Sequence, residues 1–411
     1  MNTRAQTVVV IDPISSGRRY GEDIRRKGYH ALALVTRERF PGRLQKLHGV
    51  DGFDEVLHAE GLEQAKVKLA GRTVLAVIPG SDSALRIADR LAAHLGVAGN
   101  PVATHLARMN KLEMKNRLKD EGVPSMPAFR LSMDELAQGH DPGIAFPVVV
   151  KPSQGTGARH VKICQSRSDM YKALAAIESN EEPCAQEEKH ALVEAYVEGP
   201  EFFIVTANLG AARGRQILCF AEYEKIRVGD HPSVYRNIRS ISPVGDKARQ
   251  AFAYISRVNS AIEADIGIND IEFKINADGH FIIEQNGRLP GANVPTLIEL
   301  CTGLNCYDLN IDIYLGNAPQ ALPVPHYDKH FCICCLICEA GGTVTGIEGV
   351  EQVEGLESFH ELGFLVSEGE VIEGTRDFLS TWGFVYLIHQ DPAVLRRHAE
   401  IVHERLRLVL A

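Results

Sequence analysis

The sequence lacks the signals of several large classes of protein. Its 411 residues contain no run of about 18 consecutive apolar residues, which is the length that a membrane-spanning helix needs. The apolar run at Thr7–Ile11 is much shorter than the apolar core of a secretory signal peptide. No internal repeat or low-complexity tract is present. We therefore expect a globular protein that does not bind a membrane.

Excess positive charge is also missing. Lys and Arg number 44 against 53 Asp and Glu, so the formal net charge is −9. Such a balance provides no overall field to attract nucleic acid or an anionic membrane, so local cations must hold any anionic ligand. The nine cysteines are an odd number scattered along a long chain, which indicates reduced thiols and a cytoplasmic location.

Three common functional motifs are absent as well. The dinucleotide fingerprint G-x-G-x-x-G does not follow the first apolar run, which argues against nicotinamide or flavin binding. The Walker motif G-x-x-x-x-G-K-[ST] and the zinc-hydrolase motif H-E-x-x-H do not occur. ATP binding through a Walker loop and zinc-dependent hydrolysis are thereby unsupported.

The N-terminal part shows alternating strand and helix patterns. Continuous apolar runs predict strands buried on both faces at Thr7–Ile11, His30–Val35 and Thr73–Ile78. Such a pattern is typical of an α/β fold with a doubly wound parallel sheet, whose ligand crevice lies at the carboxyl ends of the strands. The turns Ser15–Gly17 and Gly80–Ser83 lie at such ends, although turns of this kind are more often plain strand-to-helix connections.

A lysine and a glycine-rich loop come next. Asn110 followed by Glu113 resembles a capping box and predicts a helix that begins at Lys111 and ends at Gly122. The strand Phe146–Lys151 ends in a lysine and leads through residues 152–160, PSQGTGARH, into a second strand at Val161–Cys164. A glycine-rich hairpin can cover phosphates with its backbone N–H groups, but it is often just a mobile turn.

The segment Ile268–Arg288 carries the strongest metal signal. Two strands flank Ala277-Asp278-Gly279, which we predict to be a three-residue hairpin loop with Gly279 in a left-handed conformation. In that register Glu272 faces Glu284, and Asn286 shares their face. Two facing carboxylates repel, and a magnesium ion would relieve the repulsion. The same register pairs Asn276 with His280 and Lys274 with Ile282, whereas a two-residue Asp278-Gly279 turn would separate the glutamates.

Two further patterns are ambiguous by themselves. The strip Leu192–Glu201, LVEAYVEGPE, could line a flat adenine slot through its backbone, with Glu201 accepting from ribose hydroxyls. The polar stretch 229–239, GDHPSVYRNIR, is expected to be a loop whose His231, Arg236 and Arg239 recognise a substrate carboxylate, or else a solvated surface.

The C-terminal part differs in composition from about residue 323. We expect strands at Lys329–Cys338, Val350–Val353 and Gly383–Leu387 and a closing helix at Asp391–Leu410. Cys332, Cys334, Cys335 and Cys338, preceded by His326 and His330, invite a zinc interpretation. All of them lie on one short stretch, however, and even spacing puts Cys332, Cys334 and Cys338 on one strand face, which favours packing over zinc binding.

Taken together, these motifs resemble the ATP-grasp superfamily of carboxylate–amine ligases. The resemblance rests on their order: Lys111, the VVKPSQGTG segment, Glu194 seven positions before Glu201, and two glutamates twelve apart that close in E-x-N-x-R. It implies an ATP-grasp fold with ATP held between two α+β lobes. The parts expected are 1–105, an N-terminal domain; 106–200, a small lobe; and 201–411, a large lobe with the metal site and, from about 323, a C-terminal subdomain.

The resemblance also implies a role for each site residue. Lys111 and Lys151 would contact the phosphates, covered by a flap that includes Ser153, Gly155, Thr156 and Gly157. Glu194 and the backbone near Tyr196 and Val197 would read adenine, and Glu201 would hold the ribose. Glu272, Glu284 and Asn286 would hold two Mg²⁺ ions, with Mn²⁺ as a substitute. The catalytic residues would be Arg288, which steadies the acyl phosphate, and Lys225, a further phosphate contact.

The implied chemistry suits these residue types. Phosphoryl transfer requires positioning and charge neutralisation rather than a protein nucleophile, so lysines and metal-bound carboxylates dominate. A carboxylate attacks the γ-phosphate, and an amine then attacks the acyl phosphate and expels phosphate. A closing flap excludes water from that reactive intermediate.

The segment from Glu284 to Asn305, EQNGRLPGANVPTLIELCTGLN, is similar to that of L-amino-acid ligases and carnosine-synthase-like enzymes. Gly291 within it is expected to line the substrate site, whereas Gln285 and Gly287 depart from the residues common in relatives. The resemblance implies small-molecule carboxylate and amine substrates, a dipeptide or amide product, a role such as antibiotic biosynthesis, and a homodimer as one assembly. Alternatives are a biotin- or purine-carboxylase-like enzyme of primary metabolism and an inactive nucleotide-binding protein.

Overall fold

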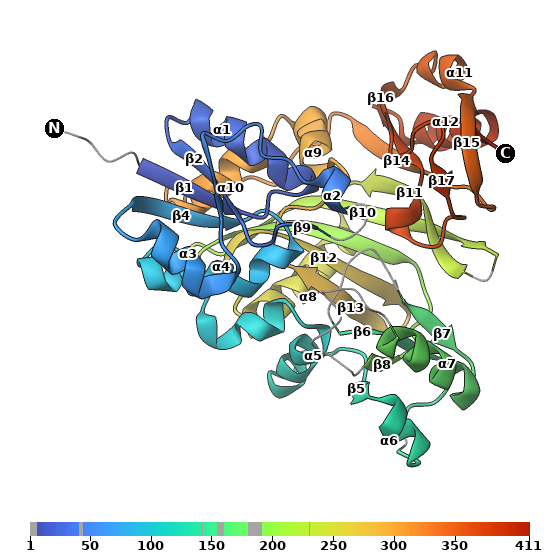
Figure 1. Cartoon of the computed structure of the whole chain (residues 1–411), viewed down its shortest axis with the longest axis horizontal. Helices are drawn as coiled ribbons and strands as arrows, with labels where there is room; N and C mark the ends of the chain where they lie inside the picture. Colours follow the sequence, from blue (N-terminus) through green and yellow to red (C-terminus); the bar gives the residue numbers. More distant parts are fainter. Residues whose placement is uncertain (1–5, 41–43, 141–142, 154–159, 180–190, 230) are drawn as a thin grey trace.

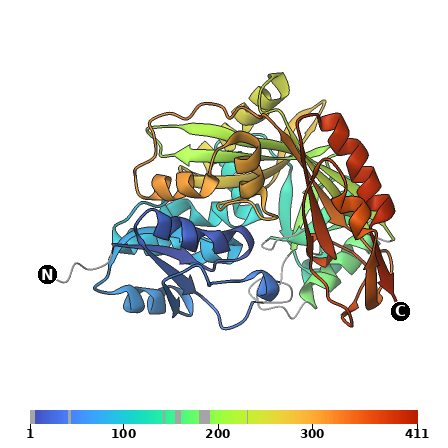
Figure 2. The same ribbon diagram turned by 90° about the horizontal axis from the view of Figure 1, so that it is seen from above.

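The computed structural model describes residues 6–40, 44–140, 143–153, 160–179, 191–229 and 231–411. Within those residues the strands form four sheets, arranged with the N-terminal sheet and the C-terminal subdomain toward opposite ends of the long axis (Figures 1 and 2). No helix in these ranges is long and apolar enough to cross a membrane. The expected α/β architecture with a parallel N-terminal sheet is confirmed.

The N-terminal sheet is parallel and has the strand order β3-β2-β1-β4. Its strands are β1 (Gln6–Ile11), β2 (His30–Val35), β3 (Glu55–His58) and β4 (Thr73–Pro79), and the runs in β1 and β2 are almost wholly buried, as their composition predicts. The neighbouring helices are α1 (Tyr20–Arg26), α2 (Leu44–Leu47), α3 (Gly61–Leu69) and α4 (Leu85–Leu95). The order reverses between β1 and β4, which places the turns after these strands at the ligand crevice of such a sheet.

A buried carboxylate organises that crevice. Asp12 follows β1 with a φ of 47° and is fully buried. It accepts hydrogen bonds from the backbone N–H and the hydroxyl of Thr36, both at 2.7 Å, and from the hydroxyl of Ser83 at 2.6 Å. Asp12 thereby ties the turns after β1, β2 and β4 to one another.

The second sheet belongs to the small lobe at the bottom of Figure 1. Helix α5 (Lys111–Asp120) leads into it, and Asn110 caps that helix by accepting from the N–H groups of Leu112 and Glu113, as predicted. The strand order is β5-β8-β6-β7, with β5 (Ala128–Leu131), β6 (Val148–Pro152), β7 (Lys162–Cys164) and β8 (Ala191–Ala195). Helices α6 (Met133–Ala137) and α7 (Arg167–Glu178) contribute to its core.

The largest sheet runs β13-β12-β9-β10-β11-β14-β18-β16 and joins the large lobe to the C-terminal subdomain. Its strands are β9 (Glu201–Leu209), β10 (Arg215–Val228), β11 (His231–Ile241), β12 (Ile266–Asn276), β13 (Gly279–Asn286), β14 (His330–Leu336), β16 (Phe359–Phe364) and β18 (Gly383–His389). Side chains of β9 alternate: Phe202 packs with helix α8 (Asp246–Ala261), and Phe203 packs with α9 (Val294–Thr302) and α10 (Cys306–Tyr314). Both faces of the sheet are thus covered.

The C-terminal subdomain surrounds a smaller sheet, β17 (Val371–Ile372), β15 (Gly342–Glu348) and β19 (Arg407–Leu410), with helix α12 (Pro392–Arg405). Two expectations are wrong here. Residues 350–353 lie in helix α11 (Val350–Glu354), since Val350 and Val353 are three apart and pack into one core. The closing helix ends at Arg405, because Leu406, Leu408 and Leu410 contact that core at every second position and continue as strand β19.

Two other local expectations concern β11 and the cysteines. The predicted polar loop at 229–239 is wrong, because residues from His231 onward form strand β11, paired with β10 and β14. The packing expected for the cysteines is confirmed: Cys332 and Cys334 are buried in the C-terminal core, Cys338 packs against it, and Cys335 lies in the core on the other side of β14.

Candidate active site

Residues from the N-terminal part, the small lobe and the large lobe line one cavity of about 470 Å³. It is lined by the turns after β1 and β4, the start of α5, strands β6, β7 and β8, the sheet strands β9 to β13, and a C-terminal loop. Most of the residues expected to form the site line it: Lys111, Lys151, Glu194, Tyr196, Val197, Glu201, Lys225, His231, Glu272, Glu284, Asn286, Arg288 and Gly291.

The hairpin β12–β13 brings two carboxylates face to face by a route that differs from the prediction. Asn276 pairs with Gly279, so the turn has two residues, Ala277 and Asp278, and the three-residue loop is wrong. The pairings expected for Asn276 and Lys274 are therefore wrong too, since Lys274 lies opposite Phe281. A β-bulge between Glu272 and Phe273 restores the register, and Glu272 pairs with Glu284 as expected.

The same face carries an acidic residue that the sequence reasoning missed. Asp270 pairs with Asn286 across the hairpin, two positions from the glutamate pair. The alternation of a strand could have revealed it, because Asp270 and Glu272 must share a face. Its Oδ1 atom is buried without a hydrogen-bond partner.

The electrostatics of this face fit a divalent cation. Burial, with the charge of Glu284 second, raises the pKa of Glu272 to about 8, and burial raises the pKa of Asp270 to about 6. The ammonium of Lys111 lies 2.6 Å from Glu284 Oε1 and offsets part of the charge. Among the described residues, no group of three or more His, Cys, Asp or Glu could hold a metal ion. Mg²⁺ is usually bound through one or two carboxylates together with substrate phosphates, which suits a facing pair of glutamates.

Glu194 lies between two lysines. Its Oε1 is 2.5 Å from Lys151 Nζ and its Oε2 is 3.2 Å from Lys115 Nζ, and all three side chains are buried. Burial would raise the pKa of Glu194, but the two lysines outweigh it and the pKa lies below its ordinary value. Both carboxylate oxygens thus face lysines, and the expected contact of Glu194 with adenine stays a prediction. Lys115 was missed, although it follows Lys111 by four residues on one helix face.

Arg288 is held by two carboxylates from different parts of the chain. Its Nε and Nη2 contact Asp82 at 2.8 and 3.1 Å, and its Nη1 contacts Asp270 Oδ2 at 3.1 Å. Burial lowers the pKa of Arg288, but both carboxylates outweigh that effect and the pKa is raised. Asp82 was not singled out individually, because the turn after β4 also reads as a plain connection.

A second ion pair also lines the cavity: Glu201 Oε1 lies 2.5 Å from Lys225 Nζ, and that ammonium sits 4.0 Å from the ring centroid of Tyr235. Lys274 donates to the carbonyl of Val197 at 2.8 Å and lies 5.0 Å from the ring centroid of Tyr196. Lys274 thus contacts Tyr196 and Val197, which were predicted to bind adenine, and it pairs in the sheet with Glu201, which was predicted to bind the ribose.

The glycine-rich loop is only partly described. Ser153 is buried, and its carbonyl accepts from the backbone N–H of Lys111 at 3.0 Å. This bond joins the start of α5 to the end of β6. Gly155, Thr156 and Gly157 lie outside the described residues.

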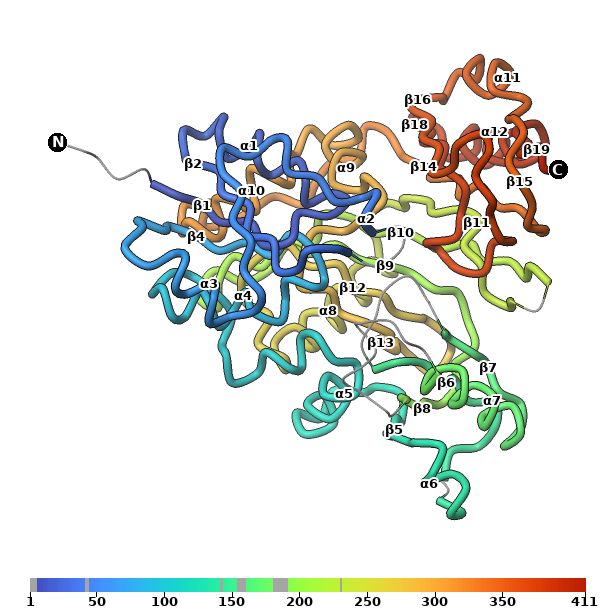
Figure 3. The backbone as a smooth tube through the Cα atoms, in the orientation of Figure 1, coloured from blue at the N-terminus to red at the C-terminus, as the bar shows by residue number. Residues whose placement is uncertain are grey.

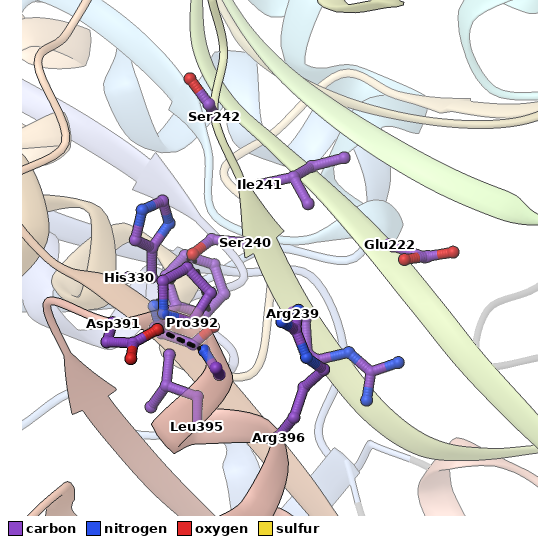
Figure 4. A pocket seen from close by; sticks show the side chains of 12 residues that line it. Glu222, Arg239, Ser240, Ile241, Ser242, His330, Asp391, Pro392, Leu395 and Arg396 are labelled. Carbon is purple, nitrogen blue, oxygen red and sulfur yellow. Dashed lines mark hydrogen bonds between the residues drawn. The ribbon is translucent and has the colours of Figure 1, made fainter.

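Arg236 and Arg239 are not brought into this cavity, so the expectation that they bind substrate there is corrected. Arg236 pairs with Glu224 and Glu400, and Arg239 pairs with Glu224. Arg239 lines a different cavity, of about 390 Å³, that His330 and Asp391 also line. Figure 4 shows Arg239 on the other side of Pro392 from His330 and Asp391. The physical reason is that β11 is a strand whose register against β10 shifts opposite Arg236. His231 and Tyr235 line the main cavity before the shift, whereas Arg236 and Arg239 both turn to Glu224 of β10.

Comparison with known proteins identifies two domains. Residues 144–296 match the family model of the ATP-grasp domain, and residues 335–411 match that of the L-amino acid ligase C-terminal domain 2. The first match covers parts of the small and large lobes, and the second covers most of the C-terminal subdomain.

Relatives extend the likeness to the whole chain. Dapdiamide A synthase of Enterobacter agglomerans is 24% identical over 95% of this chain and 94% of its own length. The L-arginine-specific L-amino acid ligase of Bacillus subtilis is 22% identical over 72% of this chain and 71% of its own length. The crystal structure of L-amino acid ligase from Bacillus licheniformis superimposes with a TM-score of 0.80 at 17% identity, covering both chains completely.

The fold and family expected from the sequence are thus confirmed. The chain belongs to the ATP-grasp superfamily and is an ATP-dependent carboxylate–amine ligase of the L-amino-acid ligase type.

Proposed function

We propose that the protein joins the carboxylate of one amino acid or related acid to the amine of a second amino acid. The carboxylate oxygen attacks the γ-phosphorus of ATP and ADP leaves, which gives an acyl phosphate. The amine nitrogen attacks the acyl carbon, phosphate leaves, and the nitrogen loses a proton to give a dipeptide or amide. The observation that carries this proposal is the meeting of lysines, facing glutamates and an arginine around one cavity.

The lysines would hold the phosphates. Lys151 and Lys111 both line the cavity, and each has a carboxylate partner, Glu194 and Glu284, that fixes its ammonium. We assign Glu194 to this side of the site, as the residue that orients Lys151 and neutralises Lys115. Tyr196 and Val197 would contact adenine, and Glu201 the ribose, with Lys225 as a further cation near the phosphates.

The metal face would consist of Glu272, Glu284 and Asn286, whose carboxylate and amide oxygens are the ligands that Mg²⁺ prefers. Two Mg²⁺ ions, for which Mn²⁺ could substitute, would neutralise the charge that develops on the phosphates. Arg288 lies beside this face and would stabilise the oxyanion that forms when the amine attacks the acyl carbon.

We further propose that residues 1–105, 106–200 and 201–411 act as three parts around the cavity. The N-terminal part would contribute to the acceptor side through its crevice turns. The small lobe would cover ATP, and the subdomain from about 323 would complete the substrate side. His231 and Gly291 line the cavity and remain candidates for substrate contact.

The test is a screen for phosphate release over pairs of amino acids with ATP and Mg²⁺, coupled to mass spectrometry of the product. We expect release that requires both members of a pair and a product mass equal to their sum less one water. Release with bicarbonate but with no amino-acid pair would contradict the proposal in favour of a carboxylase. ATP binding without release against a broad panel of acids and amines would indicate an inactive nucleotide-binding protein.

A further inference from the structure

One wall of the cavity is apolar and is built from both ends of the chain. Ile14 and Phe40 are buried in one small cluster, with Leu44 and Leu47 of α2 packed against it, and all four side chains line the cavity. Phe378 and Leu379 of the C-terminal subdomain line the same cavity.

The N-terminal half of this wall lies next to the segment that carries Arg288. The hydroxyl of Ser16 donates to the carbonyl of Pro290 at 2.7 Å, and a Cβ atom placed on Gly291 would lie 3.7 Å from Ser15 Oγ. Ile14 directly precedes these two serines in the sequence. The apolar cluster thus begins within a few residues of the proposed reaction centre.

The C-terminal half is connected to the metal face through aromatic rings. The hydroxyl of Tyr223 donates to Glu272 at 3.2 Å, and its ring meets Tyr235 edge-on at a centroid distance of 5.0 Å. Tyr235 in turn meets Phe378 edge-on at 5.4 Å. The subdomain therefore reaches the cavity at a point two aromatic contacts away from the metal face.

An ion pair joins the two halves. Lys46 Nζ lies 2.9 Å from Glu370 Oε1 and 3.5 Å from the carbonyl of Leu365, so α2 contacts the segment before β17. Figure 3 shows α2 on the side of the N-terminal part that faces the C-terminal subdomain. Two cations accompany the apolar side chains and line the cavity. The guanidinium carbon of Arg37 lies 5.9 Å from the Phe40 ring centroid, and Arg376 is paired with Glu373 in the same subdomain.

We propose that this wall binds the amine-donating substrate, and that this substrate is an α-amino acid with a large apolar side chain and a free carboxylate. The inference rests on the proposed function and names the substrate class of that same site. The carboxylate that reacts becomes the carbonyl of the new amide. The carboxylate of the amine donor takes no part in the reaction and stays charged throughout. Arginine recognises a carboxylate that persists, and Phe40, Leu44, Phe378 and Leu379 take up the apolar side chain.

The first experiment compares amine donors on the wild-type protein at saturating ATP, Mg²⁺ and acid substrate. We expect kcat/KM for L-leucine, L-methionine or L-phenylalanine to exceed that for L-aspartate and L-lysine at least tenfold. L-leucinamide, which lacks the carboxylate, is expected to show a KM at least tenfold above that of L-leucine. A preference for aspartate or lysine would overturn the inference.

The second experiment uses Phe378→Ala, Leu379→Ala and Leu44→Trp, with Val371→Ala as control because Val371 is 76% exposed on the same subdomain. The two alanine variants should raise the KM for the apolar donor at least fivefold and leave the KM for ATP within twofold. Leu44→Trp should shift preference to smaller donors. An unchanged ranking of donors in all three variants would overturn the inference, whether or not any variant loses stability.

The two levels of failure are distinguishable. Phosphate release with amino-acid pairs whose amine donor is polar keeps the proposed function and contradicts the inference about the apolar wall. Absence of release with every pair contradicts the proposed function and, with it, this inference. Calorimetric titration of the ADP- and Mg²⁺-saturated protein with L-leucine and with L-aspartate compares the affinities for an apolar and a polar amine donor without requiring turnover.

Discussion

The carboxylate of Asp82 forms a forked pair with the guanidinium of Arg288, with Oδ1 2.8 Å from Nε and Oδ2 3.1 Å from Nη2. Asp82 follows strand β4 of the N-terminal sheet, whereas Arg288 follows strand β13 of the large lobe. A fork of this kind fixes the plane of the guanidinium as well as its position. The N-terminal domain thereby orients a residue of the proposed reaction centre.

Asp82→Ala is expected to lower kcat about 10- to 100-fold, because an arginine that loses this fork no longer faces the developing oxyanion in a fixed orientation. The KM for ATP should change less than threefold, since Asp82 makes its contacts to Arg288. Steady-state kinetics with ATP and the acid substrate varied separately measure both effects. Asp246→Ala, at an exposed site, is the control. An unchanged kcat in Asp82→Ala would show that the fork has no part in turnover.

Glu194→Ala should destabilise the protein by about 3–5 kcal/mol, because it leaves Lys115 and Lys151 buried without their counter-ion. The KM for ATP should rise at least tenfold as Lys151 loses its orientation. Glu194→Gln, which keeps the shape, should be intermediate. Urea denaturation and ATP titration measure the two effects, and the exposed Glu63→Ala serves as control. Wild-type affinity for ATP in Glu194→Ala would contradict the assignment of Glu194 to the phosphate side.

Magnesium binding is expected to strengthen with pH. Burial and the neighbouring Glu284 raise the pKa of Glu272 to about 8 in the metal-free protein, so near pH 7 a metal ion must displace a proton. The affinity for Mg²⁺ in the presence of ADP should rise up to tenfold per pH unit between pH 6 and 8 and level off above. Calorimetry in buffers of different ionisation enthalpy would detect the released proton. Glu272→Gln should abolish the pH dependence, and a pH-independent affinity in the wild type would refute this prediction.

Stability is expected to fall as the pH falls from about 6.5 to 4, in part through His403. Burial, with the charge of Arg236 second, lowers the pKa of His403 to about 4. Its Nε2 lies 2.9 Å from Asn237 Oδ1, so a neutral ring with its hydrogen on Nε2 can donate a hydrogen bond to that oxygen. The unfolded chain binds the proton more tightly across this range, so protonation favours unfolding by up to about 3 kcal/mol.

Thermal melting at pH 7 and pH 5 measures this contribution. His403→Gln should lose less stability between the two pH values than the wild type does. His326→Gln, at a side chain that is 88% exposed, should behave as the wild type. An equal loss in wild type and His403→Gln would rule out a role for His403 in the acid sensitivity.

The parts of the fold that follow one dominant signal could be predicted from the sequence. The buried runs of β1, β2 and β4 and the Asn110 cap follow from apolar pattern and capping chemistry. The pairing of Glu272 with Glu284 is correct, but it was predicted from a loop that is one residue too long. The length of the hairpin turn could not be predicted. The turn is one residue shorter than expected, and a β-bulge between Glu272 and Phe273 shifts the register by one residue. The two differences cancel, so both arrangements pair Glu272 with Glu284.

The site residues that escaped prediction act through contacts across the chain. Asp82 meets Arg288 206 positions away, and Lys115 meets Glu194 from another element. No short sequence motif marks such pairs. The polar residues of β11 were predicted to form a loop because their partners, Glu224 and Glu400, lie on other elements and cannot be identified from the neighbouring sequence. Periodicity finds faces of strands and helices, but only the packing of lobes decides which charges meet.

The most direct test of the central claim is phosphate release from ATP with pairs of amino acids, comparing the wild type with Glu284→Gln. Glu284 pairs with Glu272 across the proposed metal face and holds Lys111 at 2.6 Å. We predict a condensation product and stoichiometric phosphate for the wild type, and a loss of turnover of at least 1000-fold in Glu284→Gln. Substantial turnover in Glu284→Gln, or a wild type that releases no phosphate with any pair, would contradict the account.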